Sequence, residues 1–192
     1  MTDTPRSPLP LDEIRTILER NAHAVAMRPS VGQKTARTMV RLKPGLECEV
    51  LEGQWALTIA MGQKSGGTGA GPNPGVLGRG ALGSCLALGY GMWAARLGVP
   101  LDSLEVEVEA DFDARGEMGL ADDVPPGYVQ VRYTVTVGSS APEADVRRML
   151  DTADRYSPYR DVFARAHDVR RDVRILPGVQ PLQAADSPAS PV

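Results

Sequence analysis

The sequence predicts an α+β fold in which antiparallel sheets pack against two helices. Residues 104–112 and 129–137 each alternate apolar and polar side chains, as in a strand that has one buried and one solvated face. An apolar helix is predicted over residues 74–97, and an amphipathic helix follows Pro142. Because strands and helices do not alternate along the chain as in βαβ units, the pattern favours α+β over α/β.

Composition narrows the class of protein. The 192 residues are 42% hydrophobic and 23% charged, with a net charge of −3 and no basic block, which argues against a nucleic-acid partner. No cationic start precedes an apolar run, and the apolar stretch at residues 81–95 is too short to cross a membrane. We therefore expect a cytoplasmic protein with two reduced cysteines. His23 and His167 are not spaced with them as zinc ligands, so neither a metal nor a cofactor is predicted.

The first third of the chain is predicted to form a helix and three strands. Residues 1–10 read as a disordered leader, and apolar residues recur at helical spacing over residues 11–27. Residues 34–61 read as strands broken at Pro44-Gly45 and at Glu52-Gly53. We expect one face of the second strand to hold Leu46, Cys48 and Val50, and one face of the third to hold Trp55, Leu57, Ile59 and Met61.

The middle of the chain begins with a glycine-rich loop at residues 62–74, which lacks the spacing of a phosphate-binding loop. The apolar helix that follows is expected to end at Gly98. In the first alternating strand, the acidic residues from Glu105 to Asp113 should form a solvated face. Arg132 and Arg147 are the expected surface partners of these acids.

The last third is predicted to hold the amphipathic helix and a final strand. Ser140 or Ala141 should lie near the helix cap. The apolar stripe on the helix comprises Val146, Met149, Leu150, Ala153 and Ser157. Pro158 should interrupt the helix, residues 169–176 read as a strand, and residues 177–192 read as a flexible tail. One domain over residues 11–176 is therefore expected.

Cys85 lies in the middle of the apolar helix, which also contains Gly83, Gly89 and Gly91. Each glycine costs a helix about 1 kcal/mol relative to alanine, so we expect other groups to approach this helix closely on several sides. Cys85 is either a buried structural cysteine or a reactive thiol. It lies too far from the helix start for the helix dipole to activate it. Cys48 reads as structural, because it belongs to the inward face of its strand.

Several motifs together resemble the OsmC/Ohr family of bacterial proteins induced by osmotic stress or by organic hydroperoxides. These motifs are Gly71-Pro72-Asn73-Pro74, Ala81-Leu82-Gly83-Ser84-Cys85, the acidic alternating strand, Gly127-Tyr128 and Ser157-Pro158-Tyr159. The resemblance covers residues 34–176. It implies an intertwined homodimer in which sheets from both chains wrap two central helices. The family's catalytic members are thiol peroxidases whose attacking cysteine is resolved by a second cysteine and activated by an arginine and a glutamate.

Carried onto this chain, the resemblance implies that Cys85 is the attacking thiol. Ser157 stands before Pro158, where the family has its resolving cysteine, and a serine cannot form a disulfide. Gly75 follows Pro74, where the family has its activating glutamate. Arg37 and Arg41 are candidates for the activating arginine. If the alignment is right, Ser157 should point inward and lie within about 10 Å of Cys85, roughly two helical turns.

Three functions remain open from the sequence. One is a one-cysteine reductase of organic hydroperoxides, which an external thiol would regenerate. Another is a non-catalytic protein that binds a small apolar molecule in a pocket near Cys85 and Ser157. A third uses Cys48 as a displaced resolving residue.

Overall fold

The computed structural model describes residues 7–177, which divide into two compact units. The sheet unit contains residues 35–77 and 168–177, and the helix unit contains residues 7–34 and 78–167. Most of the predicted leader, residues 1–6, and all but the first residue of the predicted tail, residues 178–192, lie outside the described residues.

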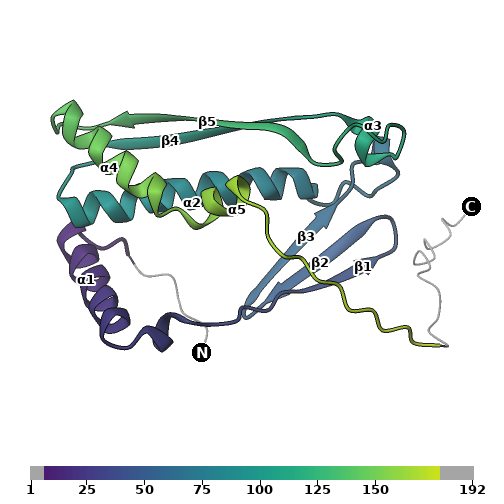
Figure 1. Cartoon of the computed structure of the whole chain (residues 1–192), viewed down its shortest axis with the longest axis horizontal. Coiled ribbons are helices and arrows are strands. Elements are labelled where there is room, and N and C mark those ends of the chain that lie inside the picture. Colours follow the sequence, from purple (N-terminus) through teal and green to yellow (C-terminus); the bar gives the residue numbers. More distant parts are fainter. Residues whose placement is uncertain (1–6, 178–192) are drawn as a thin grey trace, which may run out of the picture. The chain divides into compact units, whose positions relative to one another are not determined.

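The sheet unit is a three-stranded antiparallel sheet in the order β1-β2-β3 (Figure 1). Its strands are β1 (Met39–Lys43), β2 (Glu47–Glu52) and β3 (Trp55–Ala60), followed by the short 3-10 helix η2 (Gln63–Ser65). The two predicted breaks are confirmed, because Gly45 and Gly53 take the positive φ angles that tight turns require. Cys48 pairs with Leu42 on one side and with Ile59 on the other.

The apolar face predicted for the third strand is only partly buried. Ile59 is buried, but Trp55 and Leu57 on the same predicted face are 68% and 48% exposed. Leu46 was expected in the second strand beside Cys48; it lies instead in the preceding turn, at a positive φ of 52°. A two-residue alternation therefore identified the strands correctly, and part of their apolar surface is exposed in the described chain.

The strand predicted over residues 169–176 is wrong. In the described chain this segment joins neither sheet, and its apolar side chains are exposed. A strand is defined by hydrogen bonds to a neighbouring strand, and no described strand pairs with this segment. Its apolar spacing alone was not sufficient evidence for a strand.

The helix unit is built on α2 (Pro74–Leu97), whose first residues belong to the sheet unit. Both ends match the prediction. The Asn73 side chain accepts a hydrogen bond from the Val76 N–H at 2.9 Å, and Gly98 ends the helix with a φ of 68°. The helices α1 (Leu11–Met27) and η1 (Pro29–Gly32) precede it in the chain. α1 also has its predicted bounds, yet none of its residues is buried.

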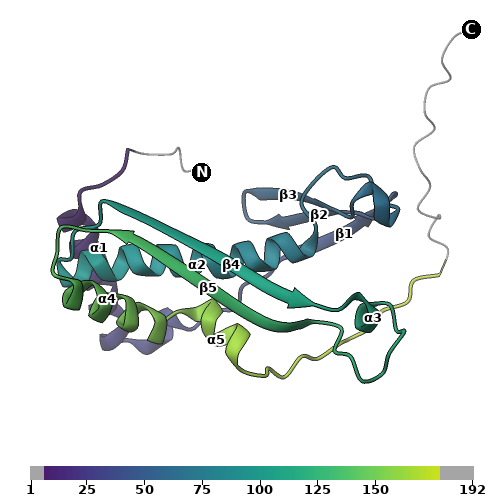
Figure 2. The same ribbon diagram turned by 90° about the horizontal axis from the view of Figure 1, so that it is seen from above.

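An antiparallel ribbon of β4 (Ser103–Phe112) and β5 (Tyr128–Gly138) runs along α2 (Figures 1 and 2). The short helix α3 (Ala114–Glu117) lies in their connection. Alternation of half-buried and exposed residues holds from Leu104 to Ala110, as predicted. It fails at Phe112 and Val129, which are exposed, because the register shifts between Asp111 and Phe112.

The core of the helix unit lies between α2, the ribbon and α4 (Glu143–Arg155). The buried residues of α2 that belong to this core recur every four positions, at Leu82, Leu86, Tyr90 and Ala94. A Cβ atom at Gly83 would lie 3.2 Å from a Val108 methyl, so this glycine permits the expected close approach. At Gly89 and Gly91 no described atom of this chain lies within 4 Å of an added Cβ, so a close approach there stays a prediction.

Helix α4 follows its predicted stripe, with Met149 and Ala153 buried against the core. Its cap is Pro142, directly after Ala141, and no side chain bonds to the cap. A separate helix, α5 (Pro158–Ala164), begins at Pro158, where the sequence predicted an interruption. No helix described between residues 7 and 177 is both long and apolar enough to span a membrane.

The acidic face of β4 is exposed, and one of its two predicted partners is correct. Arg132 bonds to both Glu109 and Asp111 across the ribbon. The prediction for Arg147 is wrong, because this residue pairs with Glu143 on its own helix. A partner four residues away on the same helix face is nearer than an acid on another element.

Candidate functional site

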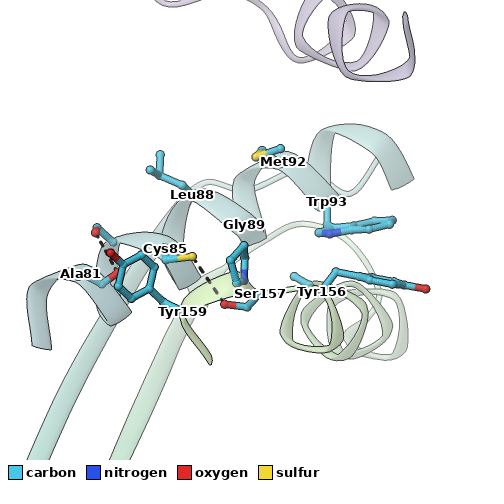
Figure 3. Close-up of a pocket in the computed structure, with 12 residues that line it drawn as sticks. Ala81, Cys85, Leu88, Gly89, Met92, Trp93, Tyr156, Ser157 and Tyr159 are labelled. Carbon is cyan, nitrogen blue, oxygen red and sulfur yellow. Dashed lines mark hydrogen bonds between the residues drawn. The ribbon is translucent and has the colours of Figure 1, made fainter. Parts of the chain in front are cut away.

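Cys85 lies on α2 at the edge of an open pocket of about 570 Å³ within the helix unit. The position follows from the helix period, because Leu82 and Leu86 point into the core and the adjacent Cys85 is only partly buried. The thiol is free. Residues of α2 form one wall of the pocket, and residues from the end of α4 and the start of α5 form the other (Figure 3).

Ser157 faces Cys85 across this pocket, with its hydroxyl oxygen 3.8 Å from the Cys85 sulfur (Figure 3). The side chain is buried, at 5% exposure, and it caps α5 by accepting a hydrogen bond from the Arg160 N–H at 3.4 Å. The expectation that Ser157 points inward and lies near Cys85 is therefore confirmed. The structural reason for this position differs in part from the predicted one, because Ser157 starts α5 instead of extending α4.

The far end of the pocket is aromatic. Trp93 of α2 and Tyr156 of α4's C-terminus stack with ring centroids 5.4 Å apart (Figure 3). The Arg96 guanidinium lies 4.3 Å from the centroid of the Trp93 ring. Leu88 and Met92 line the pocket and are exposed. All the residues that line the pocket are uncharged, so the site suits an apolar molecule better than an ionic one.

A polar network lies next to the pocket. Tyr90 and Tyr133 both donate hydrogen bonds to the Asp154 carboxylate, at 2.6 and 2.8 Å. The Arg160 Nε–H donates in turn to the Tyr133 hydroxyl at 3.2 Å. Burial, followed by the hydrogen bond to Asp154, raises the pKa of Tyr90 and of Tyr133 above the ordinary value for tyrosine. Both hydroxyls therefore stay protonated and act as donors.

Sequence reasoning missed this network, although two signals were available. Tyr90 is a polar-tipped residue within an apolar helix, and a buried tyrosine hydroxyl needs a partner. Asp154 follows the buried Ala153 on the amphipathic helix and is itself half-buried. The network joins residues separated by up to 64 positions, which no local pattern connects.

The other predicted site residues belong to the sheet unit. Arg41 forms an ion pair with Glu49, and Arg37 lies in the segment before β1. Cys48 is a free, half-buried thiol in β2. Gly75 occupies the first turn of α2. The role of Arg37 or Arg41 in activating Cys85, and that of Cys48 as a displaced resolving residue, stay predictions.

Comparison with known proteins agrees with this arrangement. A family model described as OsmC-like protein matches residues 67–170. An OsmC-like protein from Mycoplasma pneumoniae has a similar structure, with a TM-score of 0.59 and 14% identity over 68% of this chain and 88% of that one. A search of curated proteins gave no significant match.

Two further solved structures are similar. An OsmC-like protein of unknown function from Vibrio cholerae gives a TM-score of 0.54 at 13% identity, covering 68% of this chain and 94% of that one. A protein from Psychrobacter arcticus 273-4, named for osmotic stress induction and a detoxification response, gives 0.54 at 17% identity, covering 71% and 91%. These likenesses establish the fold.

Proposed function

The chain belongs to the OsmC-like protein family, and we propose that it is a one-cysteine, thiol-dependent reductase of organic hydroperoxides that serves oxidative stress defence in the cytoplasm. The single observation that carries this proposal is the position of the Cys85 sulfur. It faces an open apolar pocket and lies 3.8 Å from the hydroxyl of Ser157, which the resemblance to the family puts at the place of the resolving cysteine. An organic hydroperoxide has the apolar body that such a pocket accepts.

The proposed reaction needs two external thiols. The Cys85 thiolate attacks the terminal oxygen of the hydroperoxide, the S–O bond forms as the O–O bond breaks, and the alkoxide takes up a proton and leaves as an alcohol. Sulfur is thereby oxidised to sulfenic acid. An external thiol then attacks the sulfenic sulfur and releases water, leaving a mixed disulfide. A second thiol attacks that disulfide, regenerates Cys85 and departs as the oxidised reductant.

Ser157 contributes to this scheme by what its side chain can and cannot do. Its hydroxyl can donate a hydrogen bond to the sulfur and so stabilise the thiolate, which is the nucleophilic form. It cannot resolve the sulfenic acid as a disulfide. Arg37 or Arg41 is the proposed source of an activating guanidinium, as the resemblance to the family implies.

We expect the sulfenic acid at Cys85 to be long-lived enough to trap. After one equivalent of cumene hydroperoxide in the presence of dimedone, mass spectrometry should find the adduct on Cys85. Excess peroxide without thiol should convert Cys85 to sulfinic acid instead. Cys48 is the internal control and should stay unmodified in both experiments. Modification of both cysteines at equal rates would contradict the proposal, because Cys85 would then be no more reactive than a cysteine of the sheet.

A second function is favoured by the uncharged lining of the pocket. In this alternative the chain binds a small apolar molecule against the Trp93–Tyr156 pair and performs no chemistry at Cys85. Absence of the sulfenic adduct, together with saturable binding of an apolar ligand, would favour this alternative.

We further propose that the protein is a homodimer. The supporting observation is exposed apolar surface: Leu88 on α2 is 70% exposed, and the sheet unit exposes Trp55 and Leu57. Large exposed apolar patches mark interfaces, and obligate homodimers have the most apolar ones. Light scattering at micromolar concentration should give twice the chain mass of 20.5 kDa. A stable, well-folded monomer under these conditions would refute the dimer.

A further inference from the structure

The Asp154 carboxylate joins three elements of the helix unit at one point. It lies in the last turn of α4 and accepts hydrogen bonds from Tyr90 of α2 and Tyr133 of β5. Tyr90 is fully buried and lies five residues after Cys85 on the same helix. The carboxylate therefore links the end of α4 to the helix that carries the thiol.

Ser157 is held from both sides by groups of this network. Its backbone N–H donates to the Asp154 carbonyl oxygen at 3.3 Å. Its hydroxyl oxygen accepts from the Arg160 N–H, and the Arg160 side chain is anchored by the Tyr133 hydroxyl. With its lone pair bonded to Arg160, the Ser157 hydroxyl has its proton free to point toward the Cys85 sulfur, 3.8 Å away.

We propose that Asp154 is a positioning residue for Cys85, which acts through Tyr133, Arg160 and Ser157. This inference rests on the proposed role of Cys85 as the reactive thiol. Asp154 touches neither the thiol nor the substrate space. Instead it fixes the junction between α4 and α5, so that the Ser157 hydroxyl donates to the thiolate. Loosening the network lets this hydroxyl rotate away and makes the thiol less reactive.

A double-mutant cycle on thiol reactivity tests this chain of contacts. Cys85 is alkylated with iodoacetamide in a Cys48→Ser background, and intact-mass spectrometry gives the rate constant. Tyr133→Phe removes the hydroxyl that anchors Arg160 and should slow alkylation about threefold to tenfold, the range of one lost hydrogen bond. In a Ser157→Ala background the same substitution should have no further effect, because the hydroxyl through which it acts is gone.

Two further variants separate positioning from a general loss of structure. Tyr128→Phe removes a hydroxyl from the same strand that accepts a hydrogen bond from Arg79, which lies outside the network, and it should leave the rate unchanged. Arg160→Met keeps the backbone N–H that bonds to Ser157 but removes the guanidinium that bonds to Tyr133. It should slow alkylation as Tyr133→Phe does, and it replaces Tyr133→Phe in the cycle if Tyr133→Phe folds poorly. The inference would be overturned if Tyr133→Phe slowed alkylation equally with Ser157 present and in the Ser157→Ala background. It would also be overturned if neither Tyr133→Phe nor Arg160→Met slowed alkylation.

Alkylation needs no peroxide, so this test can fail or succeed independently of the proposed reaction. If the network variants slow alkylation but Cys85 does not reduce hydroperoxides, only the proposed function is contradicted. If Cys85 reduces hydroperoxides but the network variants do not slow alkylation, only the positioning role of Asp154 is contradicted.

Discussion

Replacing Cys85 with serine is expected to lower thiol-dependent consumption of cumene hydroperoxide to the rate measured without protein. A serine hydroxyl stays protonated at neutral pH and is a poor nucleophile unless a base activates it. The pocket lining offers no charged base, since all of its residues are uncharged. The effect should therefore be a complete loss of turnover. A coupled peroxide assay with dithiothreitol as the reductant measures it.

Cys48→Ser is the matched control for this variant. It replaces the other cysteine of the chain with the same residue, and Cys48 lies in β2 of the sheet unit. We expect its turnover to equal that of the wild type. Full activity in Cys85→Ser would refute the proposed mechanism. Loss of activity in Cys48→Ser as well would revive the hypothesis that Cys48 is a displaced resolving residue.

The second large effect is expected from Ser157→Cys, which should turn the one-cysteine site into a two-cysteine site. The present oxygen lies 3.8 Å from the Cys85 sulfur, so a thiol there would face Cys85 and could reach bonding distance by rotation of the two side chains. One equivalent of hydroperoxide should then yield an internal disulfide and no dimedone adduct. Excess peroxide should no longer produce sulfinic acid at Cys85. Mass spectrometry of reduced and non-reduced peptides distinguishes these products.

Ser84→Cys provides the control for Ser157→Cys. Ser84 also lines the pocket, but it is the neighbour of Cys85 on α2, and adjacent residues on a helix do not face each other. This variant adds a thiol to the same pocket and should leave Cys85 open to overoxidation. If Ser157→Cys fails to form the disulfide, the orientation of the two side chains, and with it the residue-by-residue carry-over from the family, is wrong.

The sequence could predict those features that depend on local spacing. The bounds of α1 and α2 coincide with the expected residues, because apolar period, proline and glycine act within a few positions. Ser157 points inward as its place in the predicted stripe suggested, although it starts α5 instead of extending α4. Residues that depend on a distant partner were missed or misassigned. Asp154 bonds to two tyrosines from other elements, and Arg147 pairs with an acidic residue of its own helix instead of one on the ribbon.

The sequence also could not predict which apolar residues of the strands are buried. Alternation in β3 placed Trp55 and Leu57 on one apolar face, and both side chains are exposed in the described chain. Alternation reports that a strand has an apolar side, and it does not say what covers that side. The same holds for residues 169–176, whose apolar spacing lacks a neighbouring strand in the described chain. Which strands pair, and which element covers an apolar face, depends on the assembled fold, and local residue patterns do not encode it.

The stack of Trp93 on Tyr156 gives this protein a built-in optical reporter. The chain has two tryptophans, and they differ in surroundings: Trp93 lies half-buried in the pocket wall, whereas Trp55 is largely exposed on the sheet. A molecule that enters the pocket changes the polarity around the Trp93 indole and thereby its emission. Removing Trp55 by substitution with phenylalanine leaves Trp93 as the single emitter. Occupancy of the space beside Cys85 then becomes readable by fluorescence, without labels and without turnover.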